Sequence, residues 1–162
     1  MNKKYVIMFV CTGNTCRSAM AQGALKVLLE KERPGKAEVI SAGTSAAHNF
    51  PATLYAIEAA KIWDADLSRH LSQPLTGALI DKADLIFGMT SSHVEIVLAI
   101  RPEASAKTYL FKNFPDSNPD GEGVEDPIGM SLDQYNQTFL EIGELLGQYL
   151  PEIVKRIDEE TK

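Results

Sequence analysis

The chain has 162 residues, of which 44% are hydrophobic and 23% are charged, proportions typical of a soluble globular protein rather than a disordered chain. This length fits one domain that spans residues 1–162. The two cysteines exclude a disulfide scaffold and a zinc site with four cysteine ligands. The formal net charge of -6 disfavours binding to nucleic acid or anionic membranes, because both depend on a surplus of Lys and Arg.

The apolar run at residues 5–10 predicts a strand that is buried on both faces of a sheet. The run is too short for a signal peptide or a membrane span, so we expect a cytoplasmic protein. Cys11 and Cys16 follow this run directly. In a reducing compartment, two thiols in one short loop favour chemistry over structure.

Strands and helices are expected to alternate after this first strand. Apolar periodicity predicts a helix over 18–32, which Pro34 and Gly35 end. The next expected elements are a strand at 37–41, a helix at about 52–62, a strand at 83–88, a helix at about 91–100 and a strand at 107–111. Such alternation predicts an α/β fold with a mostly parallel sheet and helices on both faces.

The C-terminal third is expected to combine an irregular stretch with one long helix. Residues 112–130 show no periodicity, and such a stretch in a compact domain is functional or disordered. Ser131 and Gln134 predict a capping box for a last helix, which Pro151 kinks without ending. A similar capping box is expected from Ser92 and Glu95 at the helix over 91–100.

The loop between the first strand and the first helix carries the chemistry. In a tight strand-to-helix turn, successive backbone N–H groups form an anion-binding concavity, to which the helix N-terminus adds positive charge. Arg17 can hold two oxygens of a tetrahedral oxyanion, and the same donors stabilise a Cys11 thiolate. This predicts nucleophilic phosphoryl transfer. The expected phosphate-binding residues are Thr12, Gly13, Asn14, Thr15, Cys16, Arg17 and Ser18.

Other readings of this loop fit less well. A P-loop NTPase needs Gly-Lys-Ser/Thr, and the loop has no lysine. The spacing of Cys11 and Cys16 is not that of a Cys-x-x-Cys redox motif. The three histidines lack metal-ligand spacing and the acidic residues of 112–130 lack that of a calcium loop, so we expect no metal and no cofactor.

The segment from Val10 to Ser18 resembles the phosphate loop of the low-molecular-weight protein tyrosine phosphatases. The segment 41–44 (Ser-Ala-Gly-Thr), His70 and the Asp126-Pro127 pair match further features of that family in order. The resemblance covers essentially the whole chain. It implies a four-stranded parallel sheet and a two-step reaction through a cysteinyl-phosphate.

The same resemblance assigns roles to individual residues. Cys11 attacks phosphorus, Arg17 holds the phosphoryl oxygens, and Asp126 protonates the leaving group and then activates water. The implied supports of the loop are Asn14, Ser18, Ser41 and His70. Ser18 is also expected to cap the first helix and to hydrogen-bond the thiolate.

Four positions bear on the substrate. Where tyrosine-directed members commonly have bulky aliphatic or aromatic side chains, this chain has Thr12, Thr15, Ala47 and Ile128. A pocket with fewer aromatic walls and more hydroxyls suits a leaving group that donates hydrogen bonds. Thr15 also resembles the threonine of bacterial protein arginine phosphatases, although those members usually have Phe where Ile128 stands. We therefore expect a phosphoarginine phosphatase, with phosphotyrosine as the alternative.

An arsenate reductase and a non-catalytic phosphate-binding module are two other protein classes that could contain such a loop. A thiol-relay arsenate reductase needs additional downstream cysteines, and none follows Cys16. A non-catalytic phosphate-binding module would need neither Cys11 nor Asp126. The expected partners are phosphorylated proteins, with inorganic phosphate or another tetrahedral oxyanion as product or inhibitor.

Cys11 and Cys16 are expected to form a reversible disulfide under oxidant, which would protect the nucleophile.

Overall fold

Four parallel strands form one sheet in the computed structural model, which describes residues 3–161. The strand order is β2-β1-β3-β4, with β1 pairing in parallel with both of its neighbours. The strands are β1 (Tyr5–Cys11), β2 (Ala37–Gly43), β3 (Leu85–Gly88) and β4 (Thr108–Leu110). The four-stranded parallel sheet expected from the sequence is therefore confirmed.

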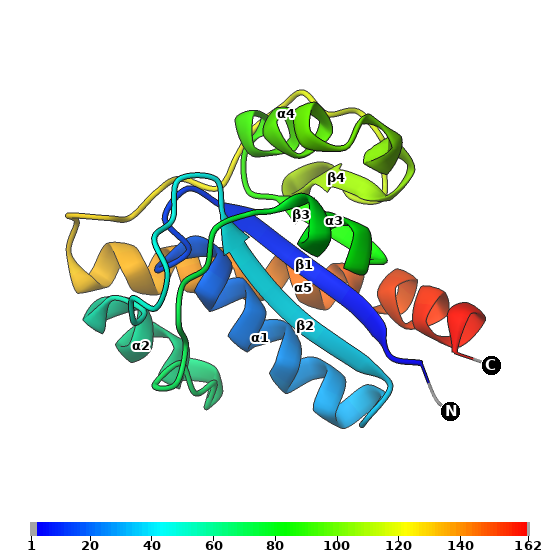
Figure 1. The fold of residues 1–162 in the computed structure, drawn as a ribbon. Coiled ribbons are helices and arrows are strands. Elements are labelled where there is room, and N and C mark those ends of the chain that lie inside the picture. Colours follow the sequence, from blue (N-terminus) through cyan, green and yellow to red (C-terminus); the bar gives the residue numbers. More distant parts are fainter. Residues whose placement is uncertain (1–2, 162) are drawn as a thin grey trace.

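Helices cover both faces of this sheet, as Figure 1 shows. The α-helices are α1 (Arg17–Glu32), α2 (Leu54–Ala60), α3 (Gly77–Lys82), α4 (Ser91–Ile100) and α5 (Leu132–Glu160). Short 3₁₀ turns occupy Lys61–Trp63, Pro102–Lys107 and Phe111–Asn113. The helices α1, α2 and α5 pack on one face, and α3 and α4 pack on the other.

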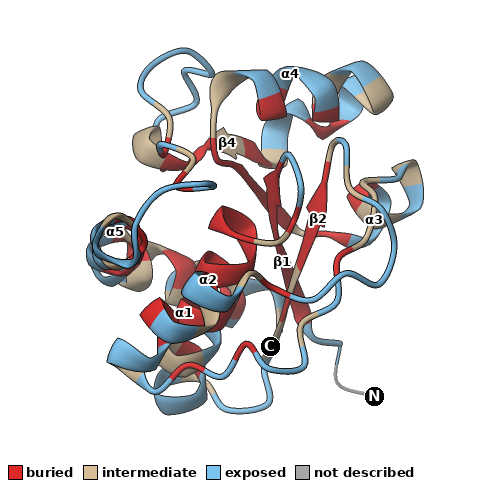
Figure 2. Cartoon of the chain, turned by 90° about the vertical axis from the view of Figure 1, so that its left-hand side faces the viewer, coloured by how far each residue is buried: buried red, intermediate tan, exposed pale blue. Residues whose placement is uncertain are grey.

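The covering of both faces explains why β1 is continuously apolar. All seven of its residues are buried, and successive side chains alternate between the two cores. Phe9 stacks on Phe87 of β3 with ring centroids 5.3 Å apart, on the face of α1 and α5. Met8 packs on the opposite face, against Ile80 of α3 and Val97 of α4. Figure 2 shows these central strands buried between helices whose outer sides are exposed.

The observed elements differ from the expected ones mainly at their ends. Strand β2 runs on to Gly43 because its last residues pair with the end of β1. The helix expected over 52–62 is α2, capped by Thr53, and its last turn tightens into a 3₁₀ turn. Helix α3 was not expected, since six residues are too few to show an apolar period.

Two of the expected helix caps are wrong and one is half confirmed. Helix α4 is capped by Thr90 together with His93, not by Ser92 and Glu95. Helix α1 has no side-chain cap, so Ser18 does not cap it. The Ser131 hydroxyl accepts from the Gln134 N–H at 3.2 Å, and α5 continues through Pro151 to Glu160. None of the helices within residues 3–161 combines the length and the apolar character needed to cross a bilayer.

The carboxyl ends of β1 and β2 meet at Cys11 and Gly43, which are paired in register. A Cβ at position 43 would lie 2.5 Å from the carbonyl oxygen of Thr12 and 2.6 Å from the Cβ of Ala46. Both distances are shorter than van der Waals contact. Glycine is therefore required here for the loop after β1 to turn back against β2.

Replacing Gly43 with Ala should push the loop at Thr12 away from β2. We expect a loss of about 2 kcal/mol in the free energy of unfolding, from overpacking. The activity expected from the resemblance of the loop should fall at least tenfold, because a shift of about 1 Å misplaces the reacting groups. Urea unfolding and kcat/KM for p-nitrophenyl phosphate measure the two effects.

Gly147→Ala is the matched control, because a Cβ there meets nothing within 4 Å. Gly147 lies in α5, where alanine is a better helix former than glycine. The change should therefore raise the free energy of unfolding by about 0.5–1 kcal/mol and leave activity unchanged. Equal activity in Gly43→Ala and the wild type would refute the role given to the close approach.

Candidate active site

The sulfur of Cys11 sits at the end of β1 and faces hydrogen-bond donors from the following loop. Cys11 is 2% exposed. The backbone N–H of Asn14 donates to its Sγ at 3.3 Å, and the Ser18 Oγ lies 2.8 Å from the same sulfur. These contacts would stabilise negative charge on the sulfur, which a nucleophilic thiolate carries.

Asn14 holds the loop in this shape from its centre. Its backbone is left-handed, with φ of 59°, and its side chain is fully buried. The side-chain nitrogen donates to the hydroxyls of Ser18 at 2.8 Å and Ser41 at 2.9 Å, and the side-chain oxygen accepts from the Gln73 N–H at 3.0 Å. The loop is thereby tied to α1, to β2 and to the segment before α3.

These contacts also fix the direction of the hydroxyl hydrogens. Ser18 Oγ accepts from the Asn14 amide, so its own hydrogen is free to donate to the Cys11 sulfur. Ser41 Oγ accepts from the same amide and donates to Oε1 of Gln22. Each serine therefore passes a hydrogen bond onward from Asn14.

His70 supports the loop from behind. Its Nε2 lies 2.6 Å from the carbonyl oxygen of Asn14, and because a carbonyl only accepts, this nitrogen carries the proton. Burial lowers the pKa of His70, whereas the bond to Asn14 acts in the opposite direction. The four expected supports, Asn14, Ser18, Ser41 and His70, thus form one connected network.

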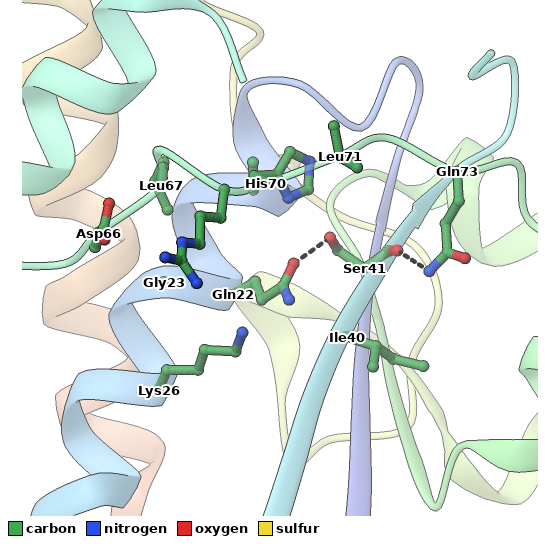
Figure 3. Close-up of a pocket in the computed structure, with 12 residues that line it drawn as sticks. Gln22, Gly23, Lys26, Ile40, Ser41, Asp66, Leu67, His70, Leu71 and Gln73 are labelled. Atoms are coloured by element: carbon green, nitrogen blue, oxygen red, sulfur yellow. Dashed lines mark hydrogen bonds between the residues drawn. The ribbon is translucent and has the colours of Figure 1, made fainter. Parts of the chain in front are cut away.

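A hollow of about 220 Å³ lies behind this network, between α1 and β2. Figure 3 shows Ser41 in it, with its hydroxyl bonded to Gln22 and its carbonyl accepting from the Gln73 amide. The hollow is separate from the sulfur of Cys11, since Cys11 does not line it. The hollow therefore lies on the side of the phosphate loop that faces away from the reacting groups, and we do not assign it as the reaction site.

Arg17 links the phosphate loop to the irregular stretch that carries Asp126. Arg17 is 6% exposed, and its guanidinium donates through Nη1 to the Val124 carbonyl at 3.1 Å. Its Nη2 lies 3.4 Å from Oδ2 of Asp126. The other carboxylate oxygen accepts from the Ile128 N–H at 3.1 Å. Two of the expected catalytic residues, 109 positions apart in sequence, are therefore adjacent.

The expected selectivity residues occupy different kinds of position. Thr15 is half-buried, and its hydroxyl lies 3.9 Å from the Cys16 sulfur. Ile128 is 60% exposed on the Asp126 loop. Thr12 and Ala47 are also exposed. The Ala47 carbonyl accepts from the Ser72 hydroxyl, which holds that segment down.

Three side chains at the site were not expected from the sequence. The Tyr135 hydroxyl lies 3.3 Å from the Cys16 sulfur, and Thr53 contacts both groups. Burial, with the contact to Cys16 second, raises the pKa of Tyr135 to about 12. His93 reaches the Thr12 hydroxyl. Tyr135 is one of the buried residues of α5, and no local signal in the sequence separates it from its core neighbours.

Both thiols are free in this structure, and the disulfide between Cys11 and Cys16 stays a prediction. Within residues 3–161, no group of three or more His, Cys, Asp or Glu side chains is arranged to hold a metal ion.

Comparison with known proteins defines the class. The family model described as low molecular weight phosphotyrosine protein phosphatase matches residues 6–162. The chain belongs to this family.

Particular relatives include both arginine and tyrosine phosphatases. The protein-arginine-phosphatase of Bacillus subtilis (strain 168) is 39% identical over 150 residues, covering 92% of this chain and 97% of the relative. The tyrosine phosphatase Etp of Escherichia coli (strain K12) is 34% identical over 133 residues, covering 82% and 84% respectively. A YwlE arginine phosphatase mutant with a phosphorylated active-site serine superposes with a TM-score of 0.85 at 38% identity, covering 94% of this chain and 99% of its own.

Replacing Asn14 with Ala should remove three side-chain hydrogen bonds and leave alanine in a left-handed conformation. We expect the free energy of unfolding to fall by about 3 kcal/mol or more, because buried partners lose their bonds. Asn49→Ala is the matched control, since Asn49 also has a positive φ, of 68°, but is exposed. It should cost only about 1 kcal/mol. Equal losses in urea unfolding would show that the network adds nothing beyond backbone strain.

Proposed function

We propose that this protein is a cysteine-dependent protein phosphatase whose preferred substrate is phosphoarginine. The observation that carries the proposal is the convergence of Cys11, Arg17 and Asp126 at the carboxyl end of the sheet. The thiol faces donors from Asn14 and Ser18, and the guanidinium lies beside the carboxylate. A nucleophile, an oxyanion-binding cation and an acid are the three groups that this two-step reaction needs.

In the first step, the Cys11 thiolate attacks phosphorus. The P–N bond of phosphoarginine breaks, and protonated Asp126 delivers its proton to the leaving nitrogen. Arg17 and the loop amides hold the phosphoryl oxygens, for which the concave loop and the N-terminus of α1 are suited. The product of this step is a cysteinyl-phosphate, and arginine departs as its guanidinium, since the phosphorylated group already carries one positive charge and the proton from Asp126 replaces the bond to phosphorus.

In the second step, water attacks the cysteinyl-phosphate. Asp126, now a carboxylate, accepts the proton of that water, and Cys11 leaves again as a thiolate. The hydrogen bonds from Ser18 and Asn14 stabilise this leaving sulfur as they stabilise the attacking one. Inorganic phosphate is released. The proton that Asp126 takes from water replaces the one it gave in the first step, so the enzyme returns to its starting protonation state.

Thr15 supports phosphoarginine over phosphotyrosine. A hydroxyl at position 15 offers an acceptor to a guanidinium N–H, which a branched aliphatic side chain would not. The relatives named protein-arginine-phosphatase and YwlE arginine phosphatase support the same choice.

Phosphotyrosine is the second candidate, and the tyrosine phosphatase relative favours it. The structure adds Tyr135, which places an aromatic ring beside the phosphate loop through its contact with Cys16. Arsenate reduction by a thiol relay is disfavoured, because the chain has only the two cysteines of the loop. The substrates would be phosphorylated proteins of the cytoplasm, where the thiols stay reduced.

A paired assay tests the substrate. We expect kcat/KM for phosphoarginine to exceed that for phosphotyrosine, and Thr15→Ile to reverse the ratio by filling the space and removing the hydroxyl. Thr15→Ser, which keeps the hydroxyl, should retain the preference of the wild type. A wild-type preference for phosphotyrosine would overturn the assignment, and an unchanged ratio in Thr15→Ile would remove Thr15 as its cause.

A second test addresses the nucleophile. Cys11→Ser should lower turnover of p-nitrophenyl phosphate by at least about a thousandfold, because a serine hydroxyl is a far weaker nucleophile than a thiolate. Binding of inorganic phosphate should persist, since Arg17 and the loop amides remain. Substantial residual turnover in a preparation free of wild-type enzyme would remove Cys11 from this role.

A further inference from the structure

His93 is a buried side chain in contact with the phosphate loop, and the two-step reaction does not use it. It is 2% exposed and lies in the first turn of α4. Its Nε2 is 2.9 Å from the hydroxyl oxygen of Thr12, the residue directly after the nucleophile. Its Nδ1 accepts from the backbone N–H of Thr90 at 3.1 Å. The ring therefore bridges the cap of α4 and the phosphate loop.

The contact with the Thr90 backbone defines the tautomer of His93, whose Nδ1 also lies 3.0 Å from the Thr90 hydroxyl oxygen. A backbone N–H only donates, so Nδ1 carries no proton and the neutral ring has its proton on Nε2. A doubly protonated ring would set two donors against each other at Thr90. Burial, and next the nearby Arg17 guanidinium, lower the pKa of His93 to about 4, against a smaller opposite effect of Asp126. The ring is thus a neutral, one-directional donor toward Thr12.

The consequence falls on the Thr12 hydroxyl. Because its oxygen accepts from Nε2 of His93, its own hydrogen remains available to a group outside the protein. Thr12 is exposed and directly follows Cys11 in the sequence. The oxygens bonded to phosphorus are the acceptors that phosphoarginine and phosphotyrosine have in common, since the guanidinium itself has donors alone.

We propose that His93 is a positioning residue that holds the Thr12 hydroxyl as a hydrogen-bond donor to an oxygen bonded to phosphorus. This inference rests on the phosphatase activity proposed above but not on the preference for phosphoarginine. It gives Thr12 a role toward the phosphoryl group that phosphoarginine and phosphotyrosine share, and leaves discrimination between them to Thr15 and Ile128.

Variants at both positions test the proposal with p-nitrophenyl phosphate and inorganic phosphate as probes. Thr12→Val removes the hydroxyl, and Thr12→Ser keeps it. His93→Asn keeps an acceptor for the Thr90 N–H but is too short to reach Thr12. His93→Gln is long enough to supply both the acceptor and a donor. Ser92→Ala is the control, because it removes a contact with Thr90 but none with His93.

Thr12→Val and His93→Asn should each lower kcat/KM about tenfold and weaken phosphate binding about as much, as expected for one hydrogen bond to a charged group. The double variant should also lose about tenfold and not a hundredfold, because both changes remove the same bond. Thr12→Ser and His93→Gln should recover most of the loss. Thermal unfolding should show that His93→Asn and His93→Gln are equally stable, and Ser92→Ala should retain wild-type activity.

Three results would overturn the proposal: an additive double variant, a His93→Gln variant as impaired as His93→Asn, or unchanged activity in Thr12→Val. A long-range ¹H–¹⁵N correlation spectrum of the wild-type protein needs no variant, and it should show His93 protonated at Nε2 alone. Any other protonation state would refute the positioning role. If the wild type did not hydrolyse p-nitrophenyl phosphate, the proposed function would fail, while phosphate binding and the His93 spectrum would still decide this inference.

Discussion

The conformation of Asn14 is the constraint on which the site depends. A left-handed backbone at this position turns the chain so that its own N–H points at the Cys11 sulfur. Most side chains disfavour that conformation by about 1–2 kcal/mol, and asparagine tolerates it better than most. Here the buried amide gains bonds to Ser18, Ser41 and Gln73, which offset the cost. Asn14 therefore adopts the unfavourable backbone conformation and also supplies, through its own side chain, the hydrogen bonds that stabilise it.

The sheet provides the frame in which this loop can form. Parallel strands bring their carboxyl ends to one edge, so Cys11, Gly43 and the residues after β3 lie close together. The Val124 N–H donates to the Met89 carbonyl just after β3, which fixes the base of the Asp126 loop. The Arg17 side chain then links this loop to the phosphate loop by donating a hydrogen bond to the Val124 carbonyl. The acid is thus held near the phosphate loop by the Arg17 side chain and the backbone of Val124 rather than by a contiguous sequence motif.

The sequence predicted what is local and apolar, and missed what depends on long-range contact. The loop from Cys11 to Ser18 could be recognised because its residues are contiguous and its physics follows from a strand-to-helix turn. The Tyr135 hydroxyl meets Cys16 across 119 positions, and His93 meets Thr12 across 81, so neither pairing leaves a local pattern. The cap of α4 was misplaced because a histidine served where a glutamate is usual. Helix α3 was missed because it is too short to show a period.

Two serine hydroxyls around the phosphate loop have the same hydrogen-bond arrangement: each accepts from a nitrogen on one side and donates on the other. A hydroxyl alone can rotate, so its hydrogen has no fixed direction. Ser18 and Ser41 each accept from the Asn14 amide and are left to donate onward, Ser18 to the Cys11 sulfur and Ser41 to Gln22. Where a nitrogen donor occupies one side of a hydroxyl, the other side becomes a donor of fixed direction. Catalysis by preorganised donors requires such direction before the substrate binds, because reorienting them during the reaction would cost part of the stabilisation.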